Sequence, residues 1–378
     1  MRVLSVILPT YNESRNVPIL IEKLGVALAG IDYEVLVVDD NSPDRTYEIV
    51  DNISKTNPRV RCIRRIHERG LSSAVVTGMS ASEAQYFAVM DADLQHDESI
   101  LPDLLRAVRE EGYDLAVGSR AAEDGSFGEW SRVRRFMSWS ATLMAKILLP
   151  VQVKDPMSGF FLTSRGVFEK ARDQINPVGF KILLEFLGRL RGLKVKEVGY
   201  TFRTRIHGET KLSGSVIRNY LVALLDLRFG HVASPVFILY CLVGASGVIV
   251  YYAVRALTDH IMISFLDTGL APPFARIPAG AILAFIFSVT NNYAWNNYLT
   301  FYDIRHKGFR IATGVILFFL VSLVGLLVQT AVTHLIHTLG MPADAASAAF
   351  ARAAGISVAV ITNYFLNVTF TWRARRIA

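Results

Sequence analysis

Long apolar runs dominate the chain from about Val232 onward, and they constrain its fold more than any other feature. The mean hydropathy of the whole chain is positive, +0.33, although 19% of its residues are charged. These two values are compatible only if charged and apolar residues are separated along the sequence. We therefore expect a soluble domain over residues 1–229 and a transmembrane domain over residues 230–378, and the length of 378 residues also favours two domains.

Four segments of the second half are long and apolar enough to cross a bilayer. They are approximately Pro235–Val254, Pro278–Leu299, Ile311–Leu335 and Ala353–Trp372. Lysine and arginine gather in the loop between the second and third segments and at the C-terminus, whereas the loop over residues 336–351 has neither. The positive-inside rule then predicts a multi-pass membrane protein with its soluble domain and C-terminus in the cytoplasm.

One motif of asparagine, threonine and aromatic residues occurs twice in this half. Asn292-Tyr293-x-x-Asn296-x-x-x-Thr300-Phe301 matches Asn363-Tyr364-x-x-Asn367-x-x-x-Thr371-Trp372. Each copy closes an even-numbered apolar segment, so we predict an all-α domain of four transmembrane helices in two repeated hairpins. Two interpretations of these polar residues stay open. They lie in the headgroup belt, or they act in helix association or in handling of a lipid carrier.

Cysteine content and charge narrow the possible classes of protein. The two cysteines, Cys62 and Cys241, are far apart and lack metal-ligand spacing, so we expect neither a disulfide nor a cysteine metal site. The net charge of +7 lies largely beside apolar segments, which favours a membrane surface over a nucleic acid as the partner. The N-terminus runs directly into a strand-like segment, and we expect no signal peptide there.

Three apolar, strand-like runs in the soluble half each end in a polar cluster. The runs are Leu4–Leu8, Glu34–Val38 and Phe87–Met90, and the clusters after them contain Tyr11-Asn12-Glu13, Asp39-Asp40-Asn41 and Asp91-Ala92-Asp93. Strand-like runs alternating with helical stretches predict an α/β domain with a mostly parallel sheet. Ligands of such sheets bind beyond the carboxyl ends of the strands, so the three clusters are expected to form one site.

The third cluster has the chemistry of a metal and diphosphate site. Asp91 and Asp93 are one residue apart just beyond a buried run, and both can reach a divalent cation whose other positions are filled by diphosphate oxygens. Oxygen ligands of this kind suit Mg²⁺ or Mn²⁺. A solvated surface turn is the alternative for a lone Asp-x-Asp. Acidic residues at three strand ends favour the metal site.

Two segments of the soluble half have the pattern of amphipathic helices. The first, about residues 132–149, begins with three arginines and continues with Phe136, Trp139, Leu143 and Ile147 at helical spacing. The second covers about residues 213–229. We expect both to lie in the membrane interface, and packing into a protein core is the alternative for the first.

Seven stretches of residues 1–225 together resemble the dolichyl/polyprenyl-phosphate mannose synthases. These enzymes are a branch of the inverting family 2 glycosyltransferases, with the A-type nucleotide-sugar fold. The stretches are Pro9-Thr10-Tyr11-Asn12-Glu13, residues 37–46, Gly70-Leu71-Ser72-Ser73-Ala74, Met90-Asp91-Ala92-Asp93-Leu94-Gln95-His96, Gly118-Ser119-Arg120, residues 155–161 and Gly179-Phe180-Lys181. The C-terminal half resembles the four-span domain fused to many prokaryotic members. The resemblance implies a Rossmann-like glycosyltransferase domain attached to a membrane domain.

The resemblance also implies roles for individual residues. Those expected to bind the nucleotide sugar are Pro9, Tyr11, Glu13, Asp39, Asp40, Asp91, Ala92, Asp93 and Lys181. Those expected at the metal are Asp91, Asp93 and Gln95. Those expected to face the acceptor phosphate are Arg120, Arg134, Arg205 and Lys211, and with Asp91 and Asp93 they form the expected catalytic group.

The implied reaction is that of a dolichyl-phosphate β-D-mannosyltransferase, EC 2.4.1.-. Mannose would pass with inversion from GDP-mannose to dolichyl or polyprenyl phosphate, with Mg²⁺ or Mn²⁺ as cofactor and a homo-oligomer as a possible state. A lipid monophosphate has a second pKa of about 6 and is largely dianionic at neutral pH, so no general base is required. Two alternatives stay open: another donor such as UDP-glucose, and a lipid-carrier flippase or sensor without catalysis.

Overall fold

The computed structural model describes residues 2–176, 181–205, 214–261, 265–267, 276–339 and 344–373. Contacts within the chain divide it into two units. The first contains Met1–Leu212 and Asn219–Arg228, and the second contains Ser213–Arg218 and Phe229–Ala378. Each unit is described by itself.

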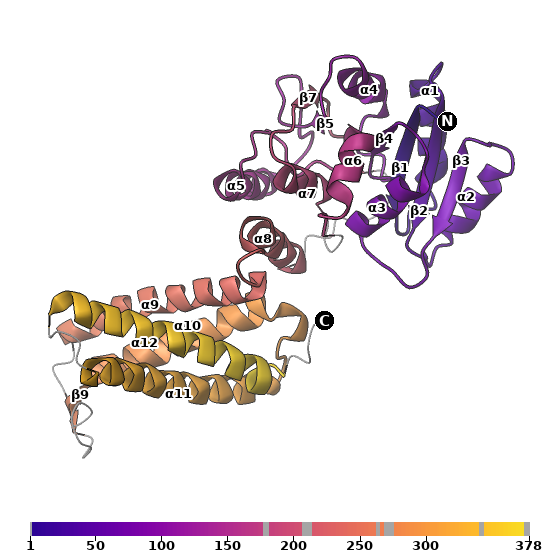
Figure 1. The fold of residues 1–378 in the computed structure, drawn as a ribbon. Helices are drawn as coiled ribbons and strands as arrows, with labels where there is room; N and C mark the ends of the chain where they lie inside the picture. The colour runs from indigo at the N-terminus through magenta and orange to yellow at the C-terminus, as the bar shows by residue number, and fades with distance from the viewer. Residues whose placement is uncertain are drawn as a thin grey trace. The chain divides into compact units, whose positions relative to one another are not determined.

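The first unit is built on a seven-stranded sheet (Figure 1). Its strands are β1 Leu4–Thr10, β2 Tyr33–Asp39, β3 Val60–Arg64, β4 Tyr86–Val89, β5 Leu115–Ser119, β6 Phe161–Ser164 and β7 Val195–Gly199, in the order β3-β2-β1-β4-β6-β5-β7. All neighbouring pairs are parallel except those of β6, which is antiparallel to both β4 and β5. The predicted α/β domain with a mostly parallel sheet is therefore confirmed.

Helices cover both faces of this sheet. They are α1 Val17–Ala27, α2 Thr46–Ser54, α3 Leu71–Ala81, α4 Leu101–Arg109, α5 Arg132–Leu148, α6 Arg165–Arg172 and α7 Ile182–Arg189. Side chains alternate along β1 so that Val6 faces the core under α1 and α4, whereas Ile7 faces the core under α3 and α7. Gly78 lets α3 approach closely, because a Cβ there would lie 2.6 Å from Ile7 Cγ2. The strand ends are thus held in place by two closely packed hydrophobic cores, one on each face of the sheet.

The apolar side chains of α5 are mostly on its outer surface. Val133, Phe136, Trp139 and Ile147 are between 59% and 72% exposed. The opposite side of the helix is held by α8 (Gly214–Phe229), where the Tyr220 hydroxyl donates to the Ala141 carbonyl over 2.6 Å. Core packing therefore does not account for the exposed apolar face of α5.

The second unit consists mainly of four helices. They are α9 Pro235–Ile261, α10 Ala279–Trp295, α11 Arg310–Thr338 and α12 Ala345–Leu366, with a small hairpin of β8 Phe265–Asp267 and β9 Arg276–Pro278. Among the described residues, three helical stretches are long and apolar enough to cross a membrane: Pro235–Thr258, Arg310–Thr338 and Ala345–Thr371. The predicted second span corresponds to α10, which has 17 residues before its geometry changes. A fourth span therefore stays a prediction.

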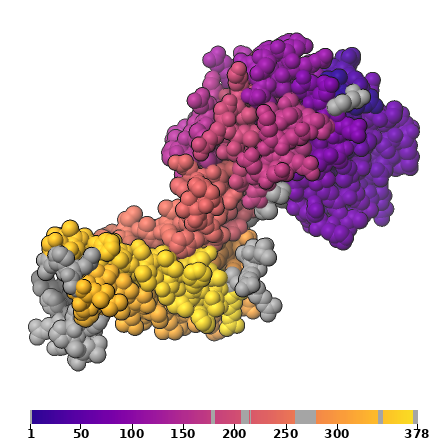
Figure 2. Space-filling model, viewed as in Figure 1, coloured from indigo at the N-terminus to yellow at the C-terminus, as the bar shows by residue number. Residues whose placement is uncertain are grey.

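The two copies of the repeated motif adopt the same local structure. Each ends in a π-helical turn, Asn296–Thr300 after α10 and Asn367–Thr371 after α12. The first asparagine of each copy lies against a glycine of the preceding helix, so that a Cβ would come within 2.3 Å of Asn292 at Gly247 and of Asn363 at Gly325. The α9–α10 and α11–α12 pairs are thus closed by the same contact. Figure 2 shows the orange and yellow segments, α11 and α12, side by side.

Buried hydrogen bonds distinguish between the two interpretations of the motif. Asn367 donates to the Tyr240 hydroxyl over 3.1 Å, and it accepts from Thr371 over 2.7 Å. Trp372 of the second copy donates through Nε1 over 3.2 Å to Oδ1 of Asn297, the residue after the motif residue Asn296. The bonds from Asn367 to Tyr240 and from Trp372 to Asn297 join segments that are far apart in the sequence, which favours a role in helix association.

Candidate active site

Three loops that follow strands share an uncommon backbone geometry. Asn12 after β1, Asn41 after β2 and Leu94 after β4 have φ values of 63°, 53° and 63°. This left-handed region is tolerated by asparagine but disfavoured for leucine, and residues held in it concentrate at binding sites. The three polar clusters predicted from the sequence therefore lie in three sharply turned loops at the carboxyl ends of neighbouring strands.

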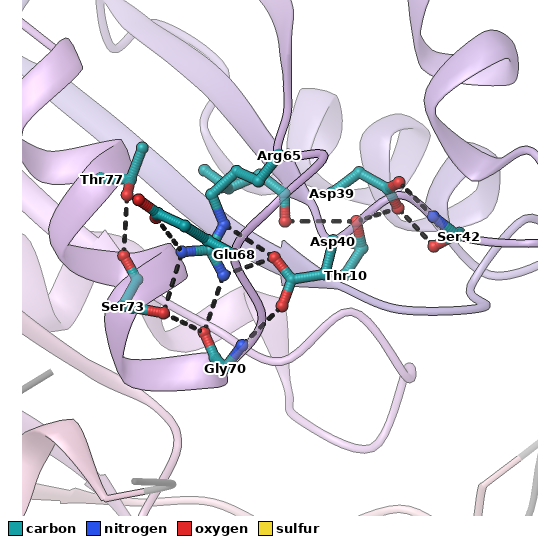
Figure 3. A network of polar contacts seen from close by, with 10 residues as sticks. Thr10, Asp39, Asp40, Ser42, Arg65, Glu68, Gly70, Ser73 and Thr77 are labelled. Carbon is teal, nitrogen blue, oxygen red and sulfur yellow. Dashed lines mark hydrogen bonds and ion pairs between the residues drawn. The ribbon is translucent and has the colours of Figure 1, made fainter. Parts of the chain in front are cut away.

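Asp39 ties the first two loops together (Figure 3). Its Oδ2 accepts from the Thr10 hydroxyl over 2.9 Å and from the Ser42 hydroxyl over 2.6 Å, and its Oδ1 accepts from the Ser42 amide over 2.8 Å. The Ser42 hydroxyl in turn accepts from the Asn12 amide. Asp39 is fully buried, and its hydrogen bonds fix the shape of both loops.

Asp40 holds the loop over residues 65–70, also visible in Figure 3. Its Oδ1 forms an ion pair with the buried Arg65, and its Oδ2 accepts from the Gly70 amide over 2.8 Å. Arg65 also donates to the Gly70 carbonyl and to Ser73. Both carboxylate oxygens are thus used inside the protein, and the predicted contact of Asp40 with a nucleotide stays a prediction.

The remaining residues of the predicted nucleotide set lie on the same side of the sheet. Pro9 is the last residue but one of β1. Tyr11, just beyond the strand, is 41% exposed, and the Arg69 guanidinium lies 5.2 Å from the centre of its ring. Burial raises the pKa of Glu13 above its ordinary value, although Asn16 donates to this carboxyl over 2.6 Å. Ala92 is buried beneath the third loop.

Asp91 is the most accessible carboxylate of the third loop, with 36% of its side chain exposed. The imidazole of His96 lies beside it, with Nε2 3.5 Å from Asp91 Oδ2. Partial burial alone would raise the pKa of Asp91, but the contact with His96 and the charges of Lys181 and Arg120 hold it below its usual value. Asp91 is therefore ionised and open to a ligand.

Asp93 and Gln95 are engaged more fully. Asp93 Oδ1 accepts from the backbone N–H of Gln95 over 3.1 Å, and Oδ2 forms an ion pair with Arg205. Gln95 donates through its side-chain Nε2 to the Arg203 carbonyl over 3.1 Å, which leaves its side-chain oxygen as the atom that could bind a cation. Arg205 was expected to face the acceptor phosphate. In the structure, its ion pair with Asp93 raises the pKa of Arg205, although burial acts in the opposite direction. The role of Arg205 toward the acceptor stays a prediction.

Arg120 is buried and paired. Its guanidinium donates to Asp155 through Nε over 2.7 Å and through Nη2 over 2.8 Å, and the rings of Trp130 and Phe202 lie about it at 5.1 and 5.2 Å. Arg120 holds the pKa of Asp155 below its ordinary value, although burial acts in the opposite direction. The sequence did not assign a role to Asp155, and its only signal was its place in the stretch of residues 155–161.

Arg134 has a different environment. Its guanidinium lies 3.9 Å from the centre of the Trp130 ring, and no carboxylate among the described residues is paired with it. Burial and the positive charges of Arg120 and Arg205 lower its pKa. Three arginines from distant segments thus converge, as an anion site requires.

Two further predicted residues complete this account. Lys181 is the residue before α7. Burial and the positive charge of Arg120 lower its pKa, although the negative charges of Asp91 and Asp155 act in the opposite direction. Lys211 lies outside the described residues, and its expected role stays a prediction.

We expect Asp155→Ala to destabilise the first unit by about 3–5 kcal/mol, because it leaves the Arg120 charge buried without its partner. Chemical unfolding of the full chain in detergent, followed by tryptophan fluorescence, measures this. Asp103→Ala is the matched control, since the exposed Asp103–Arg106 pair should contribute less than about 1 kcal/mol. The double change Asp155→Ala with Arg120→Met should recover most of the loss. Equal stability of the two single variants would contradict the assignment.

The donor atoms of the third loop fit a hard divalent cation. Among the described residues, no group of three or more histidine, cysteine, aspartate or glutamate side chains could hold a metal by itself. Two carboxylates and one amide oxygen do suffice for Mg²⁺ or Mn²⁺ when substrate phosphates and water supply the other ligands. Asp91 is accessible for this, whereas Asp93 must first exchange its contact with Arg205.

Comparison with known families divides the chain in the same way. Residues 5–172 match the model of glycosyl transferase family 2, and residues 239–372 match the model of the GtrA/DPMS transmembrane domain.

Three curated relatives carry the name dolichol-phosphate mannosyltransferase. That of Pyrococcus furiosus is 36% identical over 97% of this chain and 99% of its own length. Those of Saccharomyces cerevisiae and Mycosarcoma maydis are 39% and 38% identical over 60% of this chain, and over 88% and 81% of their own length. Among solved structures, the glucosyl-3-phosphoglycerate synthase of Mycobacterium tuberculosis in complex with phosphoglyceric acid matches 60% of this chain and 80% of its own. Its identity is 21% and its TM-score 0.48, values that carry no information about substrates.

Proposed function

The chain belongs to the dolichol-phosphate mannosyltransferase family, and on this premise we propose that it transfers mannose from GDP-mannose to a polyprenyl phosphate, with inversion at the sugar. One observation of the site carries the proposal. Asp91 and Asp93, at the end of β4, lie directly beside a group of arginines drawn from three other segments, with Arg205 in contact with Asp93. Such a site can hold a diphosphate on one side and a monophosphate on the other.

We assign the donor to the three strand-end loops. Tyr11 and the Asp39–Ser42 turn border the region proposed for the base and ribose, and the loop after β4 borders the region proposed for the diphosphate. Asp91, Asp93 and the Gln95 oxygen would hold Mg²⁺ or Mn²⁺. When bound, such a cation stabilises the negative charge that develops on the leaving nucleoside diphosphate.

We assign the acceptor phosphate to the arginines. An oxygen of the lipid phosphate attacks the anomeric carbon, and the bond from that carbon to the β-phosphate oxygen of the donor breaks, with GDP leaving. Because the dianionic phosphate is already a nucleophile, the protein need not remove a proton. Arg134 and Arg205 offer donors in a fixed planar arrangement that orients the phosphate for this attack. Positioning of this kind can contribute about 7–11 kcal/mol in ideal cases.

The membrane half brings the lipid carrier to the reaction. We propose four spans, with α10 as the second, and a cytoplasmic location for the first unit and the C-terminus. The cytoplasmic loop of this arrangement carries Arg305, Lys307 and Arg310. The exposed apolar side chains of α5 would lie in the membrane interface. Arg134 is in the first turn of the same helix, where a phosphate head group is expected.

Turnover with a panel of donors tests the proposal. The full-length enzyme, a fixed polyprenyl phosphate, and GDP-mannose, GDP-glucose or UDP-glucose at equal concentration are compared. We expect GDP-mannose to be used at least about 100-fold better than UDP-glucose, because a site that hydrogen-bonds one base leaves its polar groups unpaired with another. Preference for UDP-glucose would keep the reaction class but replace the donor. Binding without turnover of any donor would contradict catalysis and favour a lipid-carrier flippase or sensor.

A further inference from the structure

His96 is buried beside the site, and the proposed function does not use it. It follows the Asp91-Ala92-Asp93-Leu94-Gln95 loop and is 2% exposed. One ring nitrogen, Nδ1, lies 2.6 Å from the Tyr200 hydroxyl, and the other, Nε2, lies 3.5 Å from Asp91 Oδ2. The imidazole therefore stands between a phenol and the most accessible carboxylate of the site.

Both neighbours of His96 are compatible with one tautomer. The Tyr200 hydroxyl lies 2.6 Å from Nδ1 and can donate a hydrogen bond to that nitrogen. A neutral imidazole that accepts at Nδ1 carries its own proton on Nε2. That N–H faces Asp91, whose carboxylate can only accept. The direction of donation therefore runs from Tyr200 through His96 to Asp91.

The ring of His96 cannot turn away from Asp91 without disturbing three aromatic residues. The centres of the Phe160, Tyr200 and Phe202 rings lie 5.3, 5.7 and 5.5 Å from its own. A Cβ at Gly159 would come within 2.6 Å of the same oxygen, Asp91 Oδ2. Oδ2 therefore lies close to both the His96 ring nitrogen and the backbone at Gly159.

We propose that Tyr200 and His96 are positioning residues for Asp91. They fix Oδ2 and thereby the orientation of the carboxylate that would bind a divalent cation. This role rests on the proposed metal site. It requires neither residue to touch the substrate, and it requires no change of protonation during the reaction. Gly159 completes the arrangement because any larger residue would displace the carboxylate.

Calorimetric titration of Mn²⁺ into the full-length protein saturated with GDP tests this role without relying on turnover. His96→Phe keeps an aromatic ring in its aromatic surroundings but removes the donor, and we expect Mn²⁺ affinity to fall about 10- to 100-fold. His96→Gln, whose amide nitrogen can take the place of Nε2, should recover part of the loss. Tyr200→Phe should weaken Mn²⁺ binding less than His96→Phe but in the same direction.

Tyr86→Phe is the matched control for Tyr200→Phe. Tyr86 lies in β4, and no hydrogen bond of its hydroxyl occurs among the described residues. Its removal should leave Mn²⁺ affinity unchanged. Thermal unfolding of each variant separates lost affinity from lost fold. Wild-type affinity in a folded His96→Phe protein would overturn the positioning role while the proposed function stood. Absence of saturable Mn²⁺ binding to the wild type would overturn the metal site and this role together.

Discussion

Asp91→Asn is expected to lower turnover at least about 10³-fold, which corresponds to about 4 kcal/mol of transition-state stabilisation. Asp91 is the carboxylate of the third loop that is both accessible and held ionised, as the lowered pKa indicates. An amide of the same shape keeps the packing against Gly159 but supplies no negative charge to a divalent cation. The fold should therefore survive while catalysis does not.

Steady-state turnover of the full-length enzyme with donor and lipid phosphate measures this effect, and thermal unfolding checks the fold. A chelator should reduce the wild type to the level of the variant, and added Mg²⁺ or Mn²⁺ should restore only the wild type. Asp103→Asn, at an exposed carboxylate of α4, is the control and should keep full activity. Undiminished turnover of the wild type in excess chelator would contradict the metal assignment, whatever the effect of the mutation.

Arg134→Ala is expected to lower kcat/KM for the lipid phosphate about 30- to 150-fold, while the affinity for the nucleotide sugar stays within a factor of about two. A charge-assisted hydrogen bond to a phosphate contributes about 2–3 kcal/mol, and each 1.4 kcal/mol is a factor of about ten. Arg134 is the natural candidate, because burial and the charges of neighbouring arginines lower its pKa, and it stacks on Trp130 without a carboxylate partner among the described residues.

Kinetics with varied acceptor, and calorimetry with the donor alone, separate the two substrates. Arg132→Ala removes an exposed arginine from the same helix and serves as the control for a general loss of positive charge. Its effect should be less than threefold, in the manner of screened surface charge. If donor affinity collapses in Arg134→Ala, this arginine belongs to the diphosphate side of the site. Equal effects of the two variants would indicate attraction to the membrane surface rather than contact with the phosphate.

Sequence patterns predict the parts of the fold that depend on neighbouring residues. The predicted apolar runs correspond to β1, β2 and β4, which are fully or nearly fully buried, and the polar clusters after the runs lie in the loops that follow these strands. Strand β6 was not predicted. It has only four residues, and it joins the sheet antiparallel to β4, from about 75 positions away in the sequence. Short strands of this kind are specified by tertiary pairing rather than by a local pattern.

The same limit applies to the site. The resemblance to a known family predicted that Asp91, Asp93 and the arginines lie in one region. It did not show that Asp40 uses both oxygens on Arg65 and Gly70, or that Arg120 is paired with Asp155. Those partners lie 25 to 35 positions apart, and only the fold decides which carboxylate meets which arginine. In the membrane half, hydropathy placed α10 but could not reveal the π-helical turn that ends it, because that turn depends on buried hydrogen bonds of the second hairpin and the loop.

Analysis of the lipid product shows whether this enzyme joins mannose to a lipid phosphate. The purified full-length protein in liposomes is given GDP-mannose labelled in the sugar, polyprenyl phosphate and Mg²⁺ or Mn²⁺. The lipid fraction is then examined by mass spectrometry and by NMR of the anomeric carbon. We predict one hexose per lipid phosphate, joined with inverted configuration, and one GDP released for each lipid product. Release of free mannose and GDP without a mannosylated lipid, or a product of retained configuration, would contradict the account.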